Sequence, residues 1–280
     1  MKFEFVGTGG CVSLPRPLCD CPVCVEARAK GRPYSRNGCS LYLQDAALLI
    51  DTPEDIAVAL NNSNIERIEN VLYTHLDPDH TLGLRVFEQL RLNWFDVYDG
   101  KECENPITVY AMPHVMEDLN MIRSKYGAFF DYYESERCLI KRQTVSESIV
   151  LGDIKVTLVA IASSSIFVFE EGDKKLIYAP CDIKPFPEHQ LFKGADILII
   201  GDTIIGETMK GGYQLQRDNK LYDDLFHMSE VLAIKERYGI KEVIITHIEE
   251  DWGKSYDDLK ELEMNYKNLT FAYDGMTVTL

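Results

Sequence analysis

Four side chains that can bind a metal ion lie within six residues of one another, in the run Thr74-His75-Leu76-Asp77-Pro78-Asp79-His80. The run follows a short apolar stretch, residues 70–73, which has the composition of a buried strand. Pro78 and its turn context disfavour a long regular helix, so a tight loop can direct the four side chains to one point. Imidazole and carboxylate together suit divalent transition metals. A solvated polar turn is the alternative for this cluster alone.

Two further residues of ligand type each follow a predicted strand. Asp182 comes after the strand at 176–178, and His247 comes after the strand at 243–246. Strand ends are where an α/β layer usually presents its active site. Each residue alone is more typical of a turn or a sheet edge. Together with the first cluster they predict a metal centre built on His75, Asp79, His80, Asp182 and His247.

Three of the eight cysteines lie close together, at Cys19, Cys21 and Cys24. The spacing Cys-x-Cys-x-x-Cys favours a zinc site in a reducing compartment over a disulfide framework. Three free, buried cysteines are the alternative. The thiolates supply three ligands, and a structural zinc needs a fourth.

The chain has 280 residues and a formal net charge of −16. A chain without a basic stripe is a poor partner for a nucleic acid polymer, because it cannot replace the counterions of the polymer. A small anionic substrate remains compatible with this charge, since bound divalent metals dominate the local field. The first residues form a strand rather than a signal peptide, and no apolar run approaches the roughly 20 residues of a membrane span. We therefore expect a cytoplasmic protein that binds neither nucleic acid polymers nor membranes.

The elements that must position these residues alternate along the whole chain. The hydrophobic pattern predicts strands at 2–6, 40–43, 47–50, 70–73, 107–110, 154–161, 166–169, 176–178, 197–200 and 243–246. Helices are predicted at 53–60 with Thr52 as cap, at 82–92, and at 230–238 with Ser229 as cap. Three segments are interpreted as added loops, at residues 11–39, 93–105 and 209–221. Because no polar linker divides the chain, we expect one domain over 1–280 with a cysteine-bearing insertion near 11–39. Its fold class is α/β (α+β), with two sheets face to face and helices outside.

The motif at 74–80 resembles the signature Thr-His-x-His-x-Asp-His of the metallo-β-lactamase superfamily, with Asp77 in place of a histidine. The resemblance covers nearly the whole chain. It includes Gly7-Thr8-Gly9-Gly10, Asp182, Thr246-His247 and Asp274-Gly275-Met276. It implies an αββα sandwich of two mixed sheets and a hydrolase whose metal activates a water molecule. The cysteine triplet and His227 are similar to those of the PhnP-like cyclic phosphodiesterase branch, which is linked to phosphonate breakdown.

Two departures from the family pattern bear on the metals. Asp77 stands where the family has a histidine, and the loop 162–165 lacks a further histidine ligand. The resemblance therefore implies one firmly held metal on Asp79, His80, Asp182 and His247. A second position, on His75, Asp77 and the shared Asp182, should be weak or empty. Manganese, iron or magnesium then become better candidates than zinc for that second position.

The resemblance also implies roles for individual residues. Asp79 would bind the metal and orient the attacking water. His227 would bind phosphate or protonate the leaving oxygen, and a surface histidine is the alternative. The family's fourth ligand of the structural zinc is a histidine that falls near Glu250, so Glu250 or Asp251 would complete the site with Cys19, Cys21 and Cys24.

Three functions remain open at this level. The leading hypothesis is a hydrolase of a small phosphodiester, linear or cyclic, that uses zinc, manganese or iron. The alternatives are a hydrolase of esters, lactones or thioesters, and a non-catalytic member that binds a metal or metabolite. The aromatic segments at 94–95 and 129–133 fit a substrate pocket, the contact of a homodimer or core packing.

Overall fold

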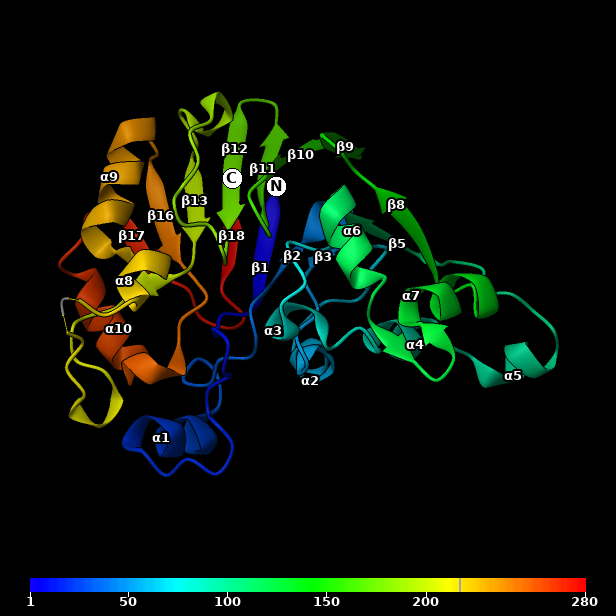
Figure 1. Ribbon diagram of the computed structural model, residues 1–280, viewed down its shortest axis with the longest axis horizontal. Coiled ribbons are helices and arrows are strands. Elements are labelled where there is room, and N and C mark those ends of the chain that lie inside the picture. Colours follow the sequence, from blue (N-terminus) through cyan, green and yellow to red (C-terminus); the bar gives the residue numbers. More distant parts are fainter. Residues whose placement is uncertain (217) are drawn as a thin grey trace.

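The computed structural model describes residues 1–216 and 218–280 of the protein. Two seven-stranded sheets lie face to face, and helices cover their outer faces (Figure 1). Helices α9 and α10 lie beside one sheet, and α2, α4 and α6 lie on the side of the other. The structure thus has the αββα sandwich that the sequence predicts.

The first sheet contains most of the N-terminal half and the last strand. Its middle strands pair parallel from β3 to β8, whereas β18, β1, β2 and β3 pair antiparallel. In spatial order its strands are β18 (Thr277–Thr279), β1 (Lys2–Gly7), β2 (Ser40–Leu43), β3 (Leu48–Ile50), β4 (Asn70–Leu72), β5 (Ile107–Ala111) and β8 (Ile140–Thr144).

The second sheet is also mixed. It is antiparallel from β9 to β12 and parallel from β12 to β17. In spatial order its strands are β17 (Leu269–Phe271), β16 (Glu242–Ile245), β13 (Ile197–Ile200), β12 (Lys174–Ala179), β11 (Ser165–Glu171), β10 (Ile154–Ala160) and β9 (Ser148–Leu151). Two short ribbons, β14 (Thr203–Ile204) with β15 (Phe226–His227) and β6 (Arg123–Ser124) with β7 (Gly127–Ala128), lie outside both sheets.

The helices are short. They are α1 (Pro22–Lys30), α2 (Ile56–Asn61), α3 (Pro78–Thr81), α4 (Val86–Arg91), α5 (Trp94–Tyr98), α6 (Pro113–Leu119), α7 (Phe129–Asp131), α8 (Leu221–Asp224), α9 (Met228–Tyr238) and α10 (Tyr256–Glu263). Single 3₁₀ turns occupy Gln44–Ala46, Gln190–Phe192, Lys210–Gly212 and Glu250–Trp252, and a π turn occupies Tyr132–Glu136. Within the described residues, no helix is long and apolar enough to cross a membrane.

Side-chain alternation along the strands produces two buried layers. In β11, Phe167 and Phe169 enter the core between the sheets, while Ile166 and Val168 enter the core beneath α9 and α10. The residues of β13 divide in the same way between the two cores. Because both faces of these strands are buried, their sequences read as unbroken apolar runs. A third, small cluster of Leu14, Cys24 and Ala27 belongs to the cysteine segment, which comprises residues 11–39.

Several predicted boundaries are wrong. The helix predicted from residue 53 begins at Ile56 and has Asp55, not Thr52, as its N-cap residue. The Thr52 hydroxyl instead bonds the Tyr73 hydroxyl at 2.7 Å. The helix predicted at 82–92 is regular only over α4, and α9 begins at Met228 with His227 in the N-cap position rather than Ser229.

The added segments contain structure of their own. Helix α1 lies within residues 11–39, apart from both sheets (Figure 1), and α5 lies within residues 93–105. The segment 209–221 includes a 3₁₀ turn, and its residue 217 lies outside the described residues. Strands β8, β9, β17 and β18 and helices α1, α6 and α10 are absent from the sequence-based prediction.

Candidate metal centre

The motif that follows β4 folds into the tight turn that its sequence predicts. Pro78 occupies the first position of the one-turn helix α3, where its missing N–H costs nothing. This turn buries Asp79 and His80. Asp79 Oδ2 lies 3.5 Å from His80 Nε2 and 3.3 Å from His247 Nε2. The structure therefore brings together three predicted ligands from two distant parts of the chain.

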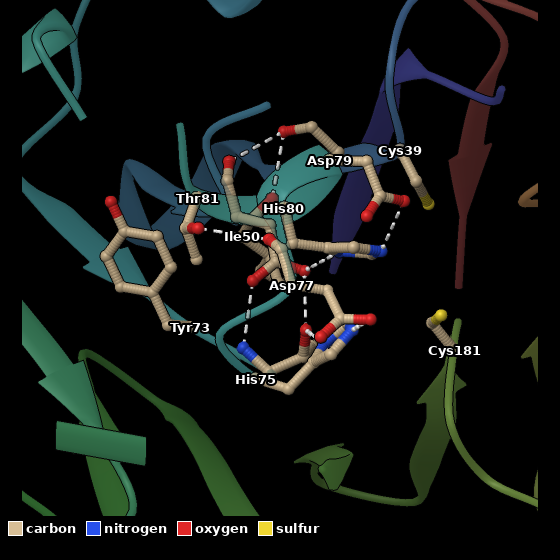
Figure 2. A network of polar contacts seen from close by, with 12 residues as sticks. Cys39, Ile50, Tyr73, His75, Asp77, Asp79, His80, Thr81 and Cys181 are labelled. Atoms are coloured by element: carbon tan, nitrogen blue, oxygen red, sulfur yellow. Dashed lines mark hydrogen bonds and ion pairs between the residues drawn. The ribbon is translucent and has the colours of Figure 1, made fainter. Parts of the chain in front are cut away.

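His75 joins the same group. Its ring centroid lies 4.2 Å from that of His80, and the His80 centroid lies 5.2 Å from that of His247. Figure 2 shows His75, Asp79 and His80 directed toward a common region. Three buried imidazoles and one carboxylate thus converge there.

Asp51, at the end of β3, contacts the imidazole of His80 directly and that of His75 through Thr74. Its carboxylate accepts hydrogen bonds from Thr74 N (2.8 Å), Thr74 Oγ1 (2.7 Å) and His80 Nδ1 (2.9 Å). Asp51 was not predicted as a site residue. Its position after the apolar strand β3, which pairs parallel with β4, is the same signal that identified Asp182.

These contacts fix the tautomers of His75 and His80. The one proton of the Thr74 hydroxyl goes to Asp51, so Thr74 Oγ1 can only accept from His75 Nδ1, which lies 2.8 Å away. His80 Nδ1 likewise donates to Asp51. In the neutral form of both rings the Nε2 atom therefore carries the lone pair.

Both Nε2 atoms are buried and lack a hydrogen-bond partner among the described residues. Buried polar atoms of a protein are normally paired. A bare imidazole nitrogen beside a carboxylate is the donor set of a divalent metal, and the hydrogen bond at the other ring nitrogen is its usual support. The residues present therefore fit a metal ion.

The parallel strands of the second sheet deliver the opposite side of the centre. Cys181 follows β12, Asp202 follows β13 and His247 follows β16, and their ligand atoms lie within 4.8 Å of one another. Cys11 and Glu249 form a further group of this kind with His247. Asp202 was also missed by the sequence analysis, because a single aspartate after a strand resembles any turn residue.

Unusual backbone conformations mark these strand ends. Asp51, Asp182, Asp202 and His247 have φ values of 60°, 54°, 49° and 50°. Aspartate and histidine tolerate this left-handed region better than most residues, but at some cost in energy. Such strain commonly accumulates at functional sites.

Two predicted ligands lie at the surface. The Asp77 side chain is 55% exposed, with Oδ2 3.8 Å from His75 Nε2. Asp182 is exposed as well, and its Oδ2 accepts a hydrogen bond from Ser163 Oγ at 3.3 Å. The structure thus gathers His75, Asp79, His80 and His247 and leaves Asp77 and Asp182 facing solvent.

His227, the predicted second catalytic residue, is exposed at the start of α9. Its ring stacks on Tyr222 with centroids 4.6 Å apart. It lines a cavity of about 310 Å³ together with Ile205 and Tyr266. Among the described residues, no hydrogen bond or ion pair links the His227 side chain to the four gathered ligands.

Burial and neighbouring charges shift the ionisation of the centre. Burial, aided by the charges of His80 and His247, lowers the pKa of His75 to about 2, so this imidazole is neutral. Burial also lowers the pKa of His247, but its hydrogen bond with Asp79 and the charges of Glu249 and Asp202 outweigh burial and raise that pKa to about 9. Burial raises the pKa of Asp202 to about 6.

The cysteine segment forms a second candidate site. The ligand atoms of Cys19, Cys21, Cys24 and Glu250 lie within 4.8 Å of one another. Cys24 Sγ lies 3.1 Å from Glu250 Oε1, and Glu250 is 2% exposed. Lys210 Nζ contacts Glu250 and lies 3.0 Å from Cys19 Sγ. Because Lys210 donates to this sulfur, the pKa of Cys19 falls to about 7.

Comparison with known proteins agrees with the fold. Residues 47–248 match the family described as "Beta-lactamase superfamily domain". No curated protein sequence matches the chain.

Several solved structures share the architecture. The Zn²⁺-bound PqqB from Methylobacterium extorquens is 22% identical, with a TM-score of 0.74 over 100% of both chains. A diphosphatase from the PhnP family is 21% identical, with a TM-score of 0.69 over 99% of this chain and 96% of that one. The short form of human tRNase Z is 16% identical, with a TM-score of 0.63 over 100% and 99%.

The family match spans β3 to the residue after His247 and so includes the gathered ligands. With two mixed sheets in face-to-face packing and a ligand cluster at their strand ends, the chain belongs to the metallo-β-lactamase superfamily.

Proposed function

We propose that the protein is a metal-dependent hydrolase that acts on a small phosphodiester, linear or cyclic. The observation that carries this proposal is the convergence of His75, Asp79, His80 and His247, with the Nε2 lone pairs of His75 and His80 unpartnered. The likeness to a diphosphatase and to tRNase Z, both named for phosphate chemistry, favours phosphorus as the reacting centre.

A divalent cation bound here would polarise a phosphoryl oxygen and lower the pKa of the water that it binds. Residues around the centre orient the proposed metal ligands. Asp51 and Thr74 hold His75 and His80 in the tautomer that presents Nε2. Asp79 Oδ2, within 3.5 Å of two imidazoles, would bind the metal and orient the attacking water.

The substrate of this proposal is small and anionic. The net charge of −16 disfavours a polyanion, and a metal ion would reverse the local field only within the site. His227 is proposed as a phosphate ligand or general acid, because it is the N-cap residue of the eleven-residue helix α9, where an anion is favoured. Ester, lactone or thioester hydrolysis at the same centre is the alternative activity.

A structural zinc on Cys19, Cys21, Cys24 and Glu250 is part of the proposal. Three thiolates and a carboxylate around Zn²⁺ carry a net negative charge, and cations surround the cluster. Lys210 contacts it, and Arg16 lies 3.6 Å from Glu250 Oε2. These cations offset the charge that burial would otherwise penalise.

The test compares metal content and hydrolysis in wild-type protein and two variants. Protein reconstituted with zinc or manganese should hydrolyse bis(4-nitrophenyl) phosphate faster than 4-nitrophenyl acetate. Asp79→Asn should lower kcat by on the order of 100-fold or more, because the water loses its orienting carboxylate. Asp99→Asn, an equal change at an exposed carboxylate of the α5 region, should keep wild-type kcat.

Three results would contradict the proposal. Full activity in Asp79→Asn would remove Asp79 from the mechanism. Faster cleavage of the acetate ester would favour the alternative activity. Failure to retain metal after reconstitution, with correct folding, would favour a non-catalytic protein.

A further inference from the structure

The sulfur of Cys181 lies between two groups of potential ligands. Cys181 Sγ is within 4.8 Å of ligand atoms of both His75 and His80, and it forms a second group of the same size with Asp202 and His247. All five side chains are buried. Figure 2 shows that Cys181 comes from a different segment than His75 and His80, with its sulfur turned toward them.

The surroundings of this sulfur differ from those of a packing cysteine. Cys39, also buried, has hydroxyl neighbours, Tyr178 at 3.5 Å and Thr246 at 3.8 Å. Within the described chain, the Cys181 sulfur has no such hydrogen-bond partner. Its neighbours include a ring nitrogen from each of His75, His80 and His247. In His75 and His80 the Nε2 atom is buried and lacks a hydrogen-bond partner among the described residues.

The backbone explains why Cys181 faces inward. The left-handed conformation of Asp182 (φ 54°) turns the chain directly after Cys181. As a result Asp182 is exposed beside Ser163, whereas the preceding residue remains buried against the imidazoles. The carboxylate that the family resemblance assigns to the end of β12 therefore points to solvent, and a thiol occupies the interior position.

We infer that Cys181, rather than Asp182, is the metal ligand supplied by the end of β12, as a thiolate shared between the His75–His80 side and the Asp202–His247 side of the centre. This inference rests on the proposed metal site. On binding, the S–H bond gives its proton to buffer and the sulfur lone pair forms the metal bond. A thiolate selects Zn²⁺ or Co²⁺ over Mn²⁺ and Mg²⁺, which prefer oxygen ligands. The preference is therefore the opposite of that expected from Asp77 and Asp182.

Cobalt spectroscopy tests this ligand directly. Metal-free wild-type protein, Cys181→Ser and the neighbouring control Asp182→Asn are each titrated with Co²⁺. Cys19, Cys21 and Cys24 contribute the same thiolate-to-cobalt charge-transfer absorption in all three proteins. Cys181→Ser should lose a discrete part of that absorption and bind Zn²⁺ at the centre on the order of tenfold or more weakly, with Mn²⁺ affinity unchanged. Asp182→Asn should retain the wild-type spectrum.

The outcomes separate this inference from the proposed function. A His80→Ala variant with the wild-type cobalt spectrum would mean that cobalt binds only at the cysteine triplet, which overturns both. Absorption lost in His80→Ala but kept in Cys181→Ser would overturn the inference alone.

Anomalous scattering at the zinc edge from zinc-loaded wild-type crystals is a second test that needs no variant. A peak bonded to Cys181 Sγ supports the inference, and a peak bonded to Asp182 without Cys181 overturns it.

Discussion

At the residue scale, Asp51 links the fold to the proposed metal centre. One buried carboxylate accepts from a backbone amide, a hydroxyl and an imidazole, and so defines how both His75 and His80 present their Nε2 atoms. Outer partners of this kind usually matter nearly as much as the ligands themselves. Asp51 is therefore a positioning residue whose contribution can be separated from that of the ligands.

Asp51→Asn should weaken Zn²⁺ affinity by about 10- to 100-fold and lower the free energy of unfolding by about 1 to 3 kcal/mol. Asparagine tolerates the left-handed backbone of this position (φ 60°), so the change acts on charge and acceptor capacity rather than on strain. Competition with a chelator and urea denaturation measure the two effects. Asp45→Asn, at an exposed carboxylate that accepts from Lys2 N, is the control. Equal Zn²⁺ affinity in Asp51→Asn and wild type would contradict this role.

At the element scale, the centre depends on how closely the ends of β12, β13 and β16 approach. Gly201, directly after β13, lies where a Cβ atom would meet the Pro180 carbonyl and approach His247 Cβ to 2.7 Å. The absence of a side chain at position 201 thus permits the strand ends to bring Cys181, Asp202 and His247 together. The same close approach is not visible in the sequence, where Gly201 resembles a turn residue.

Gly201→Ala should lower the free energy of unfolding by about 1 to 3 kcal/mol and also weaken metal binding, because Pro180 and His247 must move apart. Gly172→Ala is a matched control. Gly172 has φ 59° and open space around it, so alanine there costs backbone strain of about 1 kcal/mol without reaching the centre. Calorimetry and Zn²⁺ titration of both variants distinguish the two effects. Equal metal affinity in Gly201→Ala and Gly172→Ala would contradict the argument.

The sequence predicts those elements whose burial leaves a clear pattern. Strands such as β3 and β13 are apolar at every position because both faces are covered, and they were predicted within a residue of their bounds. The three-residue strands β17 and β18 are too short to show a period. Helix α1 buries only Cys24 and Ala27, so its sequence has no apolar stripe.

The start of α2 was mispredicted because tertiary contacts compete with local capping. The Asp55 carboxylate accepts hydrogen bonds from Ser13 and Gly38, which belong to a distant segment, and provides no side-chain cap to its own helix. The proposed exchange of Asp182 for Cys181 as the ligand from the end of β12 has a related reason. Which of two consecutive residues faces inward depends on the backbone angle at the strand end, and residue types alone do not determine it.

At the scale of the whole molecule, the cysteine segment is attached to the sandwich by few apolar contacts. Its own buried cluster contains only Leu14, Cys24 and Ala27, whereas the two main cores contain dozens of side chains. The polar group of Cys19, Cys21, Cys24 and Glu250 is therefore one of the polar connections between this segment and the 3₁₀ turn after His247, beside contacts such as Arg16 with Asp251. Local stability should differ sharply between the segment and the sheets.

If the cysteine group binds the proposed zinc, removal of that metal should loosen this segment without unfolding the sandwich. Either Cys24→Ala or chelation of the wild-type protein should raise amide hydrogen exchange in residues 12–35 and around Lys210. Exchange in β12, β13 and β16 should stay slow, because those strands are buried on both faces. Cys138→Ala, a cysteine far from the group in sequence and absent from it, controls for loss of a thiol. Mass spectrometry of peptic fragments measures the exchange. Loss of exchange protection across both sheets would mean that the segment unfolds cooperatively with the sandwich. Unchanged protection everywhere would mean that metal binding at the cysteines has no structural role.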